Sequence, residues 1–218
     1  MAAKTVICLD LDGTLADSID AHVQAYNLAF RKNGLPAKSR REITATFGQP
    51  AGKIIKHLFP KTPNQKLFSV LKDKHEFFLK ETYKLVRSFG GIANALEKLK
   101  EKYILALISN AAHEEIVKTL KQVKISKKLF DTILGEGEFE PKPSPEFVKK
   151  VENKIGRRVE FVVGDTIYDI KSGKAAHVKT IAVLSGVQDI KTLGAEDPTM
   201  IIKSVAVLPE ILEGDLMQ

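Results

Sequence analysis

The stretch Thr-Val-Ile-Cys-Leu-Asp-Leu-Asp-Gly-Thr at residues 5–14 decides the fold of this 218-residue chain. Residues 5–11 are apolar and β-branched at their start, and Asp12-Gly13 is a strong turn signal. The pattern predicts a buried strand followed by a loop. Further apolar runs of strand length, none alternating as in a one-sided sheet, lie at residues 104–108, 132–134, 159–163 and 180–184. They predict the other central strands of a parallel sheet.

Amphipathic segments of helix length separate these runs in the second half of the chain. They lie at residues 92–102, 113–122, 145–155 and 167–176. The alternation of strand and helix predicts an α/β fold, a doubly wound parallel sheet with a Rossmann-like core. Ligands of such sheets bind beyond the carboxyl ends of the strands, so polar residues just after each strand are candidates for a site.

Residues 18–88 interrupt the alternation. Helical patterns follow one another there without a convincing strand, at residues 19–32, 40–47 and 65–83. We predict an inserted α-helical cap domain at residues 18–88 and a Rossmann-like core formed by residues 1–17 and 89–218. Because the insert leaves and re-enters just after the first strand, it is expected over the carboxyl edge of the sheet, where a lid would lie.

The composition is that of an ordinary globular protein, with 44% hydrophobic and 28% charged residues. A net charge of +7 suits anionic ligands, although the lysines are dispersed and most are expected on a solvated surface. We expect no nucleic-acid partner, since no recognised motif is present, and no membrane partner, since no apolar run approaches roughly 18 residues. Without a secretory signal pattern the protein is expected to be cytoplasmic. Cys8, the single cysteine, is expected to be an inert buried thiol.

Asp10 and Asp12 stand two residues apart at the end of the first strand, so their side chains point to the same side. Close carboxylates repel each other unless a cation neutralises them, which suits either a divalent metal or a nucleophile paired with an acid–base group. Gly13 permits a tight turn, and Thr14 offers a hydroxyl and an N–H to an anion. Alone, this motif is also a common turn and helix-capping pattern.

Later strand ends add further polar residues. Ser109 and Asn110 follow the strand at residues 104–108, where a hydroxyl could hold a phosphoryl oxygen, although a lone serine there is usually a helix N-cap. Lys142 lies in Glu-Pro-Lys-Pro-Ser-Pro at residues 140–145, where prolines restrict the backbone and aim the ammonium. A solvated loop lysine is the alternative.

Asp165 and Asp169 follow the strand at residues 159–163, in Gly-Asp-Thr-Ile-Tyr-Asp at residues 164–169, about one helical turn apart. Acidic residues also favour helix N-termini. That preference does not explain why four strand ends each supply one member of an acid, hydroxyl, lysine and acid set. The set predicts a common pocket.

In this order, residues 10–14, Ser109, Lys142 and residues 164–169 resemble the four motifs of the haloacid dehalogenase superfamily, over nearly the whole chain. The helical insert resembles that superfamily's cap domain of the first class, and the phosphoglycolate phosphatase-like branch is the best match. The resemblance implies a Mg²⁺-dependent phosphatase that hydrolyses a small phosphomonoester through an aspartyl-phosphate. Phosphoglycolate is the leading substrate candidate.

The resemblance also implies a role for each motif residue. Asp10 would be the nucleophile, and Asp12 the general acid and then base. Mg²⁺ would bind the Asp10 carboxylate, the Asp12 backbone carbonyl and Asp165, with Asp169 beside them. Ser109 and Lys142 would hold the phosphoryl oxygens, and we expect Thr14 and Asn110 to bind the phosphate as well. Lys142 would also orient Asp10, and the second aspartate, Asp12, favours phosphoryl transfer over dehalogenation.

The cap supplies the remaining candidates. His22 resembles a cap histidine of β-phosphoglucomutases, which keeps a phosphosugar mutase as an alternative. Against a mutase, residue 164 is glycine where those enzymes usually carry glutamate, and residues 47–50 lack a basic residue. The Gly-Gln-Pro break predicts a loop facing the sheet, which would bring Gly48, Gln49 and Lys53 near the leaving group. A non-catalytic phosphate-binding protein is the alternative from another class, and a monomer or homodimer is expected.

Overall fold

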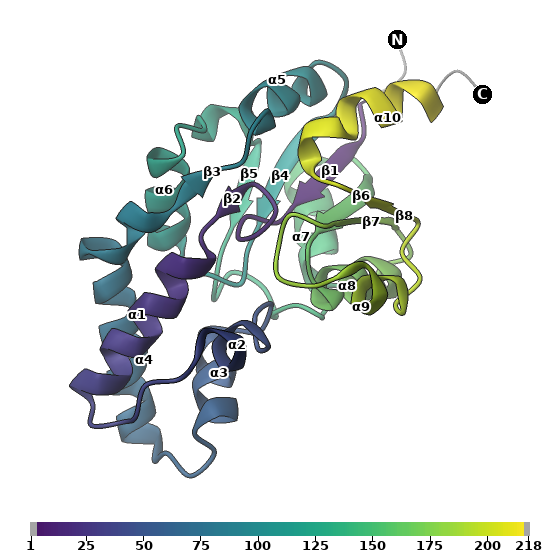
Figure 1. Cartoon of the computed structure of the whole chain (residues 1–218). Helices are drawn as coiled ribbons and strands as arrows, with labels where there is room; N and C mark the ends of the chain where they lie inside the picture. Colours follow the sequence, from purple (N-terminus) through teal and green to yellow (C-terminus); the bar gives the residue numbers. More distant parts are fainter. Residues whose placement is uncertain (1–3, 216–218) are drawn as a thin grey trace.

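The computed structural model describes residues 4–215 and has a six-stranded sheet at its centre (Figure 1). The strand order is β5-β4-β1-β6-β7-β8, and all neighbouring strands are parallel. The strands are β1 (Val6–Leu9), β4 (Ile104–Ile108), β5 (Thr132–Leu134), β6 (Val159–Gly164), β7 (Lys179–Val183) and β8 (Met200–Ile202). The predicted α/β, doubly wound fold is confirmed, with β8 as an edge strand that the sequence pattern missed.

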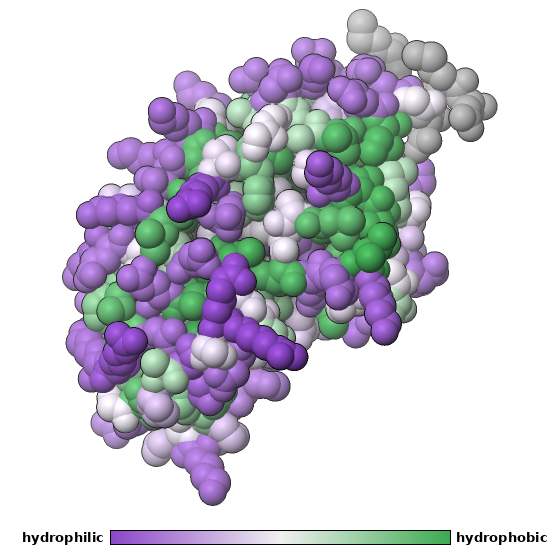
Figure 2. Space-filling view, viewed as in Figure 1, coloured by the Kyte–Doolittle hydropathy of each residue, from purple (hydrophilic) through white to green (hydrophobic). Residues whose placement is uncertain are grey.

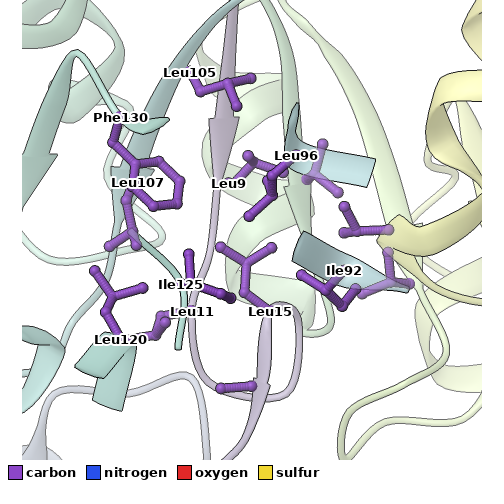
Figure 3. Close-up of a cluster of buried hydrophobic side chains, with 14 of the residues drawn as sticks. Leu9, Leu11, Leu15, Ile92, Leu96, Leu105, Leu107, Leu120, Ile125 and Phe130 are labelled. Atoms are coloured by element: carbon purple, nitrogen blue, oxygen red, sulfur yellow. The ribbon is translucent and has the colours of Figure 1, made fainter. Parts of the chain in front are cut away.

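Both faces of β1 are buried, which is why its sequence is apolar without alternation. Ile7 and Leu9 belong to a large apolar cluster with α5 (Ile92–Lys102), α6 (His113–Gln122) and α10 (Leu208–Asp215), part of which Figure 3 shows. Val6 and Cys8 point into a second cluster, under α7 (Glu146–Ile155). Cys8 is buried, and burial raises the pKa of its thiol, in agreement with an inert side chain.

The register aligns the strand ends. Leu9 is paired with Leu107 of β4 and with Val163 of β6. The residues that follow these positions therefore emerge at one edge of the sheet, next to the switch point at which the strand order reverses around β1. Helix α8 (Ile167–Ala175) begins at this edge, directly after β6, and α9 (Ile190–Gly194) follows β7.

The segment between β1 and α5 is helical, as its sequence pattern predicts, and lies beside the sheet (Figure 1). Its helices are α1 (Ile19–Lys32), α2 (Arg40–Thr44), α3 (Ala51–Leu58) and α4 (Asn64–Lys80). Figure 2 shows predominantly hydrophilic side chains over this region, as expected of amphipathic helices that bury one face. Tyr26, Phe30, Ile43, Ile55 and Val70 form an apolar cluster separate from those of the sheet.

Two short strands, β2 (Ala16–Asp17) and β3 (Arg87–Ser88), pair antiparallel where the chain leaves and re-enters the core. The sequence pattern did not predict them. Together with the separate apolar cluster, the pair supports our proposal that residues 18–88 form a cap domain on a core of residues 1–17 and 89–218. The remaining 3-10 segments are η1 (Thr82–Leu85), η2 (Lys127–Leu129) and η3 (Val205–Val207).

Within residues 4–215 there is no helix with both the length and the apolar character needed to cross a membrane.

Candidate functional site

A pocket lies between the carboxyl edge of the sheet and the helices of residues 18–88. Its empty volume is ≈ 700 Å³, including space open to solvent. Most of the residues that the sequence singled out line it: Asp10, Asp12, His22, Gly48, Gln49, Ser109, Asn110, Lys142, Asp165 and Asp169. The predicted convergence of the four strand ends is therefore present in the structure.

Lys142 links two of these carboxylates. Its Nζ donates to Asp10 Oδ1 at 2.6 Å, to Asp169 Oδ1 at 2.6 Å and to the Ile108 carbonyl oxygen at 2.9 Å. These three acceptors match the three N–H donors of an ammonium group. Burial by itself would lower the pKa of Lys142, but the charges of Asp10 and Asp169 outweigh it and raise the pKa. The loop of residues 140–145 thus presents a charged lysine inside the protein.

Asp10 is the carboxylate bound by Lys142 at the end of β1. Its side chain has a relative exposure of 12%, at the wall of the pocket. Burial raises the pKa of Asp10 well above its ordinary value, the Lys142 charge opposes this, and the neighbouring carboxylates of Asp169, Asp165 and Asp12 add to the rise. A further cation near Asp10 would therefore favour its ionised form.

Asp12 faces residues at the start of α1. Its Oδ1 accepts a hydrogen bond from Ser18 Oγ at 2.5 Å and lies 3.2 Å from His22 Nε2, while Ser109 Oγ donates to Oδ2 at 3.4 Å. Burial raises the pKa of Asp12, but His22 and the Ser18 hydroxyl outweigh it and lower the pKa to about 2. The imidazole of His22 is itself stacked on Phe78, with ring centroids 4.4 Å apart.

The Asp165 carboxylate is closely surrounded by the loops that contain Gly13 and Gly186. Thr14 Oγ1 donates to its Oδ1 at 3.2 Å, and Val187 N donates to Oδ2 at 3.1 Å. A Cβ at Gly186 would lie 1.8 Å from Oδ2 and one at Gly13 2.5 Å from it, so only glycine lets the chain approach this closely. Burial and the charge of Asp169 raise the pKa of Asp165 to about 7.

Thr14 is fully buried and does not line the pocket, so the predicted contact of Thr14 with phosphate is not present in the structure. Its hydroxyl holds Asp165 instead.

Asp169 serves both as a helix cap and as a partner of Lys142. Its Oδ2 accepts from the backbone N of Thr166 at 3.1 Å and from Thr166 Oγ1 at 2.6 Å, which forms the capping box of α8. The sequence left open whether this aspartate is a cap or a site residue, and the structure shows both contacts. Gly164 makes room for it, because a Cβ there would lie 2.2 Å from Asp169 Cγ.

Asn110 connects the helical insert to the lysine loop. Its Nδ2 donates to the Gly48 carbonyl oxygen at 2.8 Å, and its Oδ1 accepts from the Lys142 backbone N at 3.1 Å. The amide is thus engaged by protein at both ends. Gln49 lines the pocket next to Gly48, whereas Lys53 is exposed on α3 and does not line it. We therefore leave Lys53 out of the site.

Ser18, Tyr26 and Lys74 are among the pocket residues that the sequence does not single out. Lys74 was detectable, because Val70 and Phe78 lie four residues before and after it on α4 and both are buried. A lysine at this spacing occupies the apolar face of the helix.

The loop at Gly48 offers a test of how the insert is held on the core. Gly48 has φ +91°, and a Cβ there would lie 2.4 Å from Tyr168 Cδ2 and 2.9 Å from Thr166 Oγ1. We expect Gly48→Ala to lower the free energy of unfolding by about 2–3 kcal/mol, from backbone strain plus overpacking. Gly34→Ala is the matched control, since Gly34 has φ +66° with nothing within 4 Å. Urea unfolding measures both, and equal losses would show that the docked loop contributes nothing.

Comparisons with known proteins bear on the family resemblance drawn from the four motifs. The model of the haloacid dehalogenase-like hydrolase family matches residues 7–183. The chain is 27% identical to pyrophosphatase PpaX of Halalkalibacterium halodurans, over 98% of this chain and 97% of that protein. It is 32% identical to the phosphoglycolate phosphatase of Aquifex aeolicus, over 83% of this chain and 85% of that protein.

A solved hydrolase of the haloacid dehalogenase-like family from Streptococcus pneumoniae has the same fold, with a TM-score of 0.83 at 20% identity, covering 99% of this chain and 100% of that one. The family match runs from within β1 to the end of β7, and of the pocket-lining residues all but Val187 lie inside it. The resemblance to the superfamily that the four motifs indicate is confirmed. The phosphoglycolate phosphatase-like branch is confirmed as well, since the relatives include the phosphoglycolate phosphatase of Aquifex aeolicus. The chain belongs to the haloacid dehalogenase-like hydrolase family.

Proposed function

We propose that the protein is a Mg²⁺-dependent phosphatase that hydrolyses a small phosphomonoester through an aspartyl-phosphate on Asp10. The observation that carries the proposal is the contact of Lys142 Nζ with Asp10 Oδ1, at the pocket wall and beside Asp12 and Asp165. Phosphoglycolate is the first substrate candidate, because a relative named for its hydrolysis is 32% identical to this chain. The relative named pyrophosphatase makes pyrophosphate the second candidate.

The geometry suits Asp10 as the nucleophile. Lys142 holds Oδ1, which fixes the carboxylate and leaves Oδ2 to attack phosphorus. In this step the bond from Asp10 to phosphorus forms, and the bond from phosphorus to the leaving oxygen breaks. Ser109 contributes its hydroxyl to the pocket for the phosphoryl oxygens, and Lys142, whose three donors are engaged by protein, contributes its positive charge.

Asp12 is the proposed proton carrier. It protonates the leaving oxygen in the first step and takes a proton from water in the second, when the aspartyl-phosphate is cleaved. Ser18 and His22 hold its Oδ1 and keep it ionised in the ligand-free protein, with a pKa of about 2. The negative charge of a bound phosphate raises that pKa, so that Asp12 takes up a proton from solvent as the substrate binds and gives it to the leaving oxygen in the first step.

A divalent cation fits the remaining carboxylates. Burial raises the pKa values of both Asp10 and Asp165, so a positive charge between them would favour the ionised forms. The expected ligands are these two carboxylates and the Asp12 backbone carbonyl. When bound, Mg²⁺ would neutralise phosphoryl charge during the transfer.

The alternative mutase function receives no support from residue 164. A glutamate there could not coexist with the observed position of Asp169, since even a Cβ would lie 2.2 Å from Asp169 Cγ. The Asp169 side chain would have to shift from its observed position. The expectations of a cytoplasmic protein and of a monomer or homodimer stay predictions.

A panel of phosphomonoesters, assayed with Mg²⁺ and with excess chelator, tests the proposal. We expect turnover of phosphoglycolate or another small ester, and a decrease of at least about 100-fold on chelation, because the metal supplies several kcal/mol of charge stabilisation. Full activity in chelator would contradict the metal dependence. Absence of turnover across the panel would favour the non-catalytic binding protein, and isomerisation of a sugar phosphate faster than phosphate release would favour the mutase.

A further inference from the structure

Lys74 is a buried cation in the wall of the pocket. It lies on the apolar face of α4 with a relative exposure of 5%, in the series Val70, Lys74, Phe78. Its Nζ is 5.5 Å from the centroid of the Tyr26 ring and 5.4 Å from that of Phe78. A charge is costly in such surroundings unless partners stabilise it. Its presence at an apolar position therefore requires an explanation.

Glu115, on α6 of the core, is the partner of Lys74. Lys74 Nζ donates to Glu115 Oε2 at 2.7 Å, and His75 Nδ1 lies 2.9 Å from Oε1. Burial raises the pKa of Glu115, but Lys74 and His75 outweigh it and lower the pKa. Both carboxylate oxygens are therefore engaged, and the charge of Glu115 is shared between two basic side chains.

The donors of the two pocket lysines differ in how fully they are used. Lys142 has three oxygen acceptors, whereas Lys74 has one in the described part of the chain, Glu115 Oε2. Two N–H donors of Lys74 thus remain for the aromatic faces and for a ligand. Its charge also helps to lower the pKa of Asp12, so it acts electrostatically on the reacting end of the pocket.

The rest of the wall contributed by residues 18–88 is largely apolar. Ile19, Phe47, Ala51 and Ile54 line it beside Lys74 and offer no charge to a substrate. The leaving group of a phosphomonoester held at Asp10 would extend from the sheet edge toward this wall. Among the described residues of this wall, Lys74 is the only lysine or arginine that lines the pocket.

We propose that Lys74 binds a second anionic group of the substrate, a carboxylate or a phosphoryl group, on the leaving-group side of the pocket. It thereby selects phosphate compounds with a second anion over esters with a neutral leaving group. The inference rests on the proposed phosphatase function. Glu115 holds Lys74 in place and lowers the cost of burying its charge before the substrate arrives.

The experiment compares kcat/KM for phosphoglycolate, pyrophosphate and ethyl phosphate, which has a neutral leaving group of similar size to glycolate. The test variant is Lys74→Met with Glu115→Gln, since the double change leaves no unpaired buried charge. We expect a decrease of about 10- to 100-fold for phosphoglycolate or pyrophosphate, mainly through KM, as for loss of a charged hydrogen bond. Ethyl phosphate is expected to change by less than about 3-fold.

Two further variants complete the design. Lys72→Met removes the same charge from the same helix, but Lys72 is exposed and does not line this pocket, so selectivity should stay as in the wild type. Lys74→Arg keeps the charge and should retain part of the preference for anionic leaving groups. Thermal unfolding of each variant confirms that it is folded.

The outcomes separate the two proposals. If the wild type hydrolyses ethyl phosphate as well as it hydrolyses phosphoglycolate and pyrophosphate, or if the double variant loses all three activities equally, the Lys74 inference is overturned while the phosphatase function stands. If the wild type hydrolyses none of a broad panel with Mg²⁺, the phosphatase function itself fails, and the subsite inference fails with it. If the double variant loses kcat/KM for phosphoglycolate only, the second anion is a carboxylate. If it loses kcat/KM for pyrophosphate only, the second anion is a phosphoryl group.

Discussion

Asp10→Asn is expected to lower kcat for an aryl phosphate by at least about 1,000-fold while the protein stays folded. An amide oxygen is a poor nucleophile, so no aspartyl-phosphate can form at this position. The fold should tolerate the change, because Lys142 keeps its bonds to Asp169 and to the Ile108 carbonyl. In addition, the variant lacks a buried carboxyl whose pKa is already raised by burial.

The measurement is steady-state turnover with Mg²⁺, together with mass spectrometry of acid-quenched enzyme to detect covalent phosphate. Asp20→Asn is the control, since Asp20 is exposed on α1 and paired with Arg40. The control should keep full activity, because exposed ion pairs contribute little. Substantial Mg²⁺-dependent turnover by Asp10→Asn would refute Asp10 as the nucleophile.

The core of this site was predictable because the sheet imposes strong constraints. A strand buried on both faces must be apolar throughout, so the end of the apolar run marks the edge of the sheet. Parallel strands then bring the following residues together, which is how Asp10, Ser109 and Asp165 are found from sequence alone. The sequence places Lys142 and Asp169 in one pocket but does not predict their contact, because strand order fixes which residues meet at the sheet edge and not which side chains bond to each other.

The helical insert was less predictable for a physical reason. Each of its helices buries one apolar face against the other helices of the insert. The period of the apolar residues identifies that face, but it does not say which other residues face the sheet. The bounds of helix α3 were not predicted, and Lys53 on it is exposed. Lys74 was overlooked because its partner, Glu115, is 41 residues away on another helix. A lysine at an apolar position is a usable signal only when that position is compared with its neighbours at i−4 and i+4.

Lys142→Met is expected to lower both stability and activity. It leaves the buried carboxylates of Asp10 and Asp169 without their shared cation, and breaking a buried ion pair by removing one partner costs about 3–5 kcal/mol. The loss of a fixed nucleophile and of a phosphate-binding charge should lower kcat/KM by about 1,000-fold. Urea unfolding and turnover with Mg²⁺ measure the two effects.

The stability loss should depend on pH in a definite direction. Without Lys142, the charge that opposes the raised pKa of Asp10 is gone, so its folded-state pKa rises further above its unfolded value. A carboxyl with a raised folded pKa stabilises the protein below its unfolded pKa, and that stability is lost as the pH rises through the folded pKa. The difference between the variant and the wild type should therefore be larger at pH 8 than at pH 5.

Two controls distinguish charge compensation from simple packing. Lys150→Met removes a lysine that is half exposed on α7, paired with Glu146, and should change stability by less than about 1 kcal/mol. Adding Asp169→Asn to Lys142→Met removes one of the stranded charges and should recover part of the stability without recovering activity. If the double variant is no more stable than Lys142→Met, or if the loss does not grow with pH, then Lys142 stabilises the core by packing rather than by compensating the buried carboxylates.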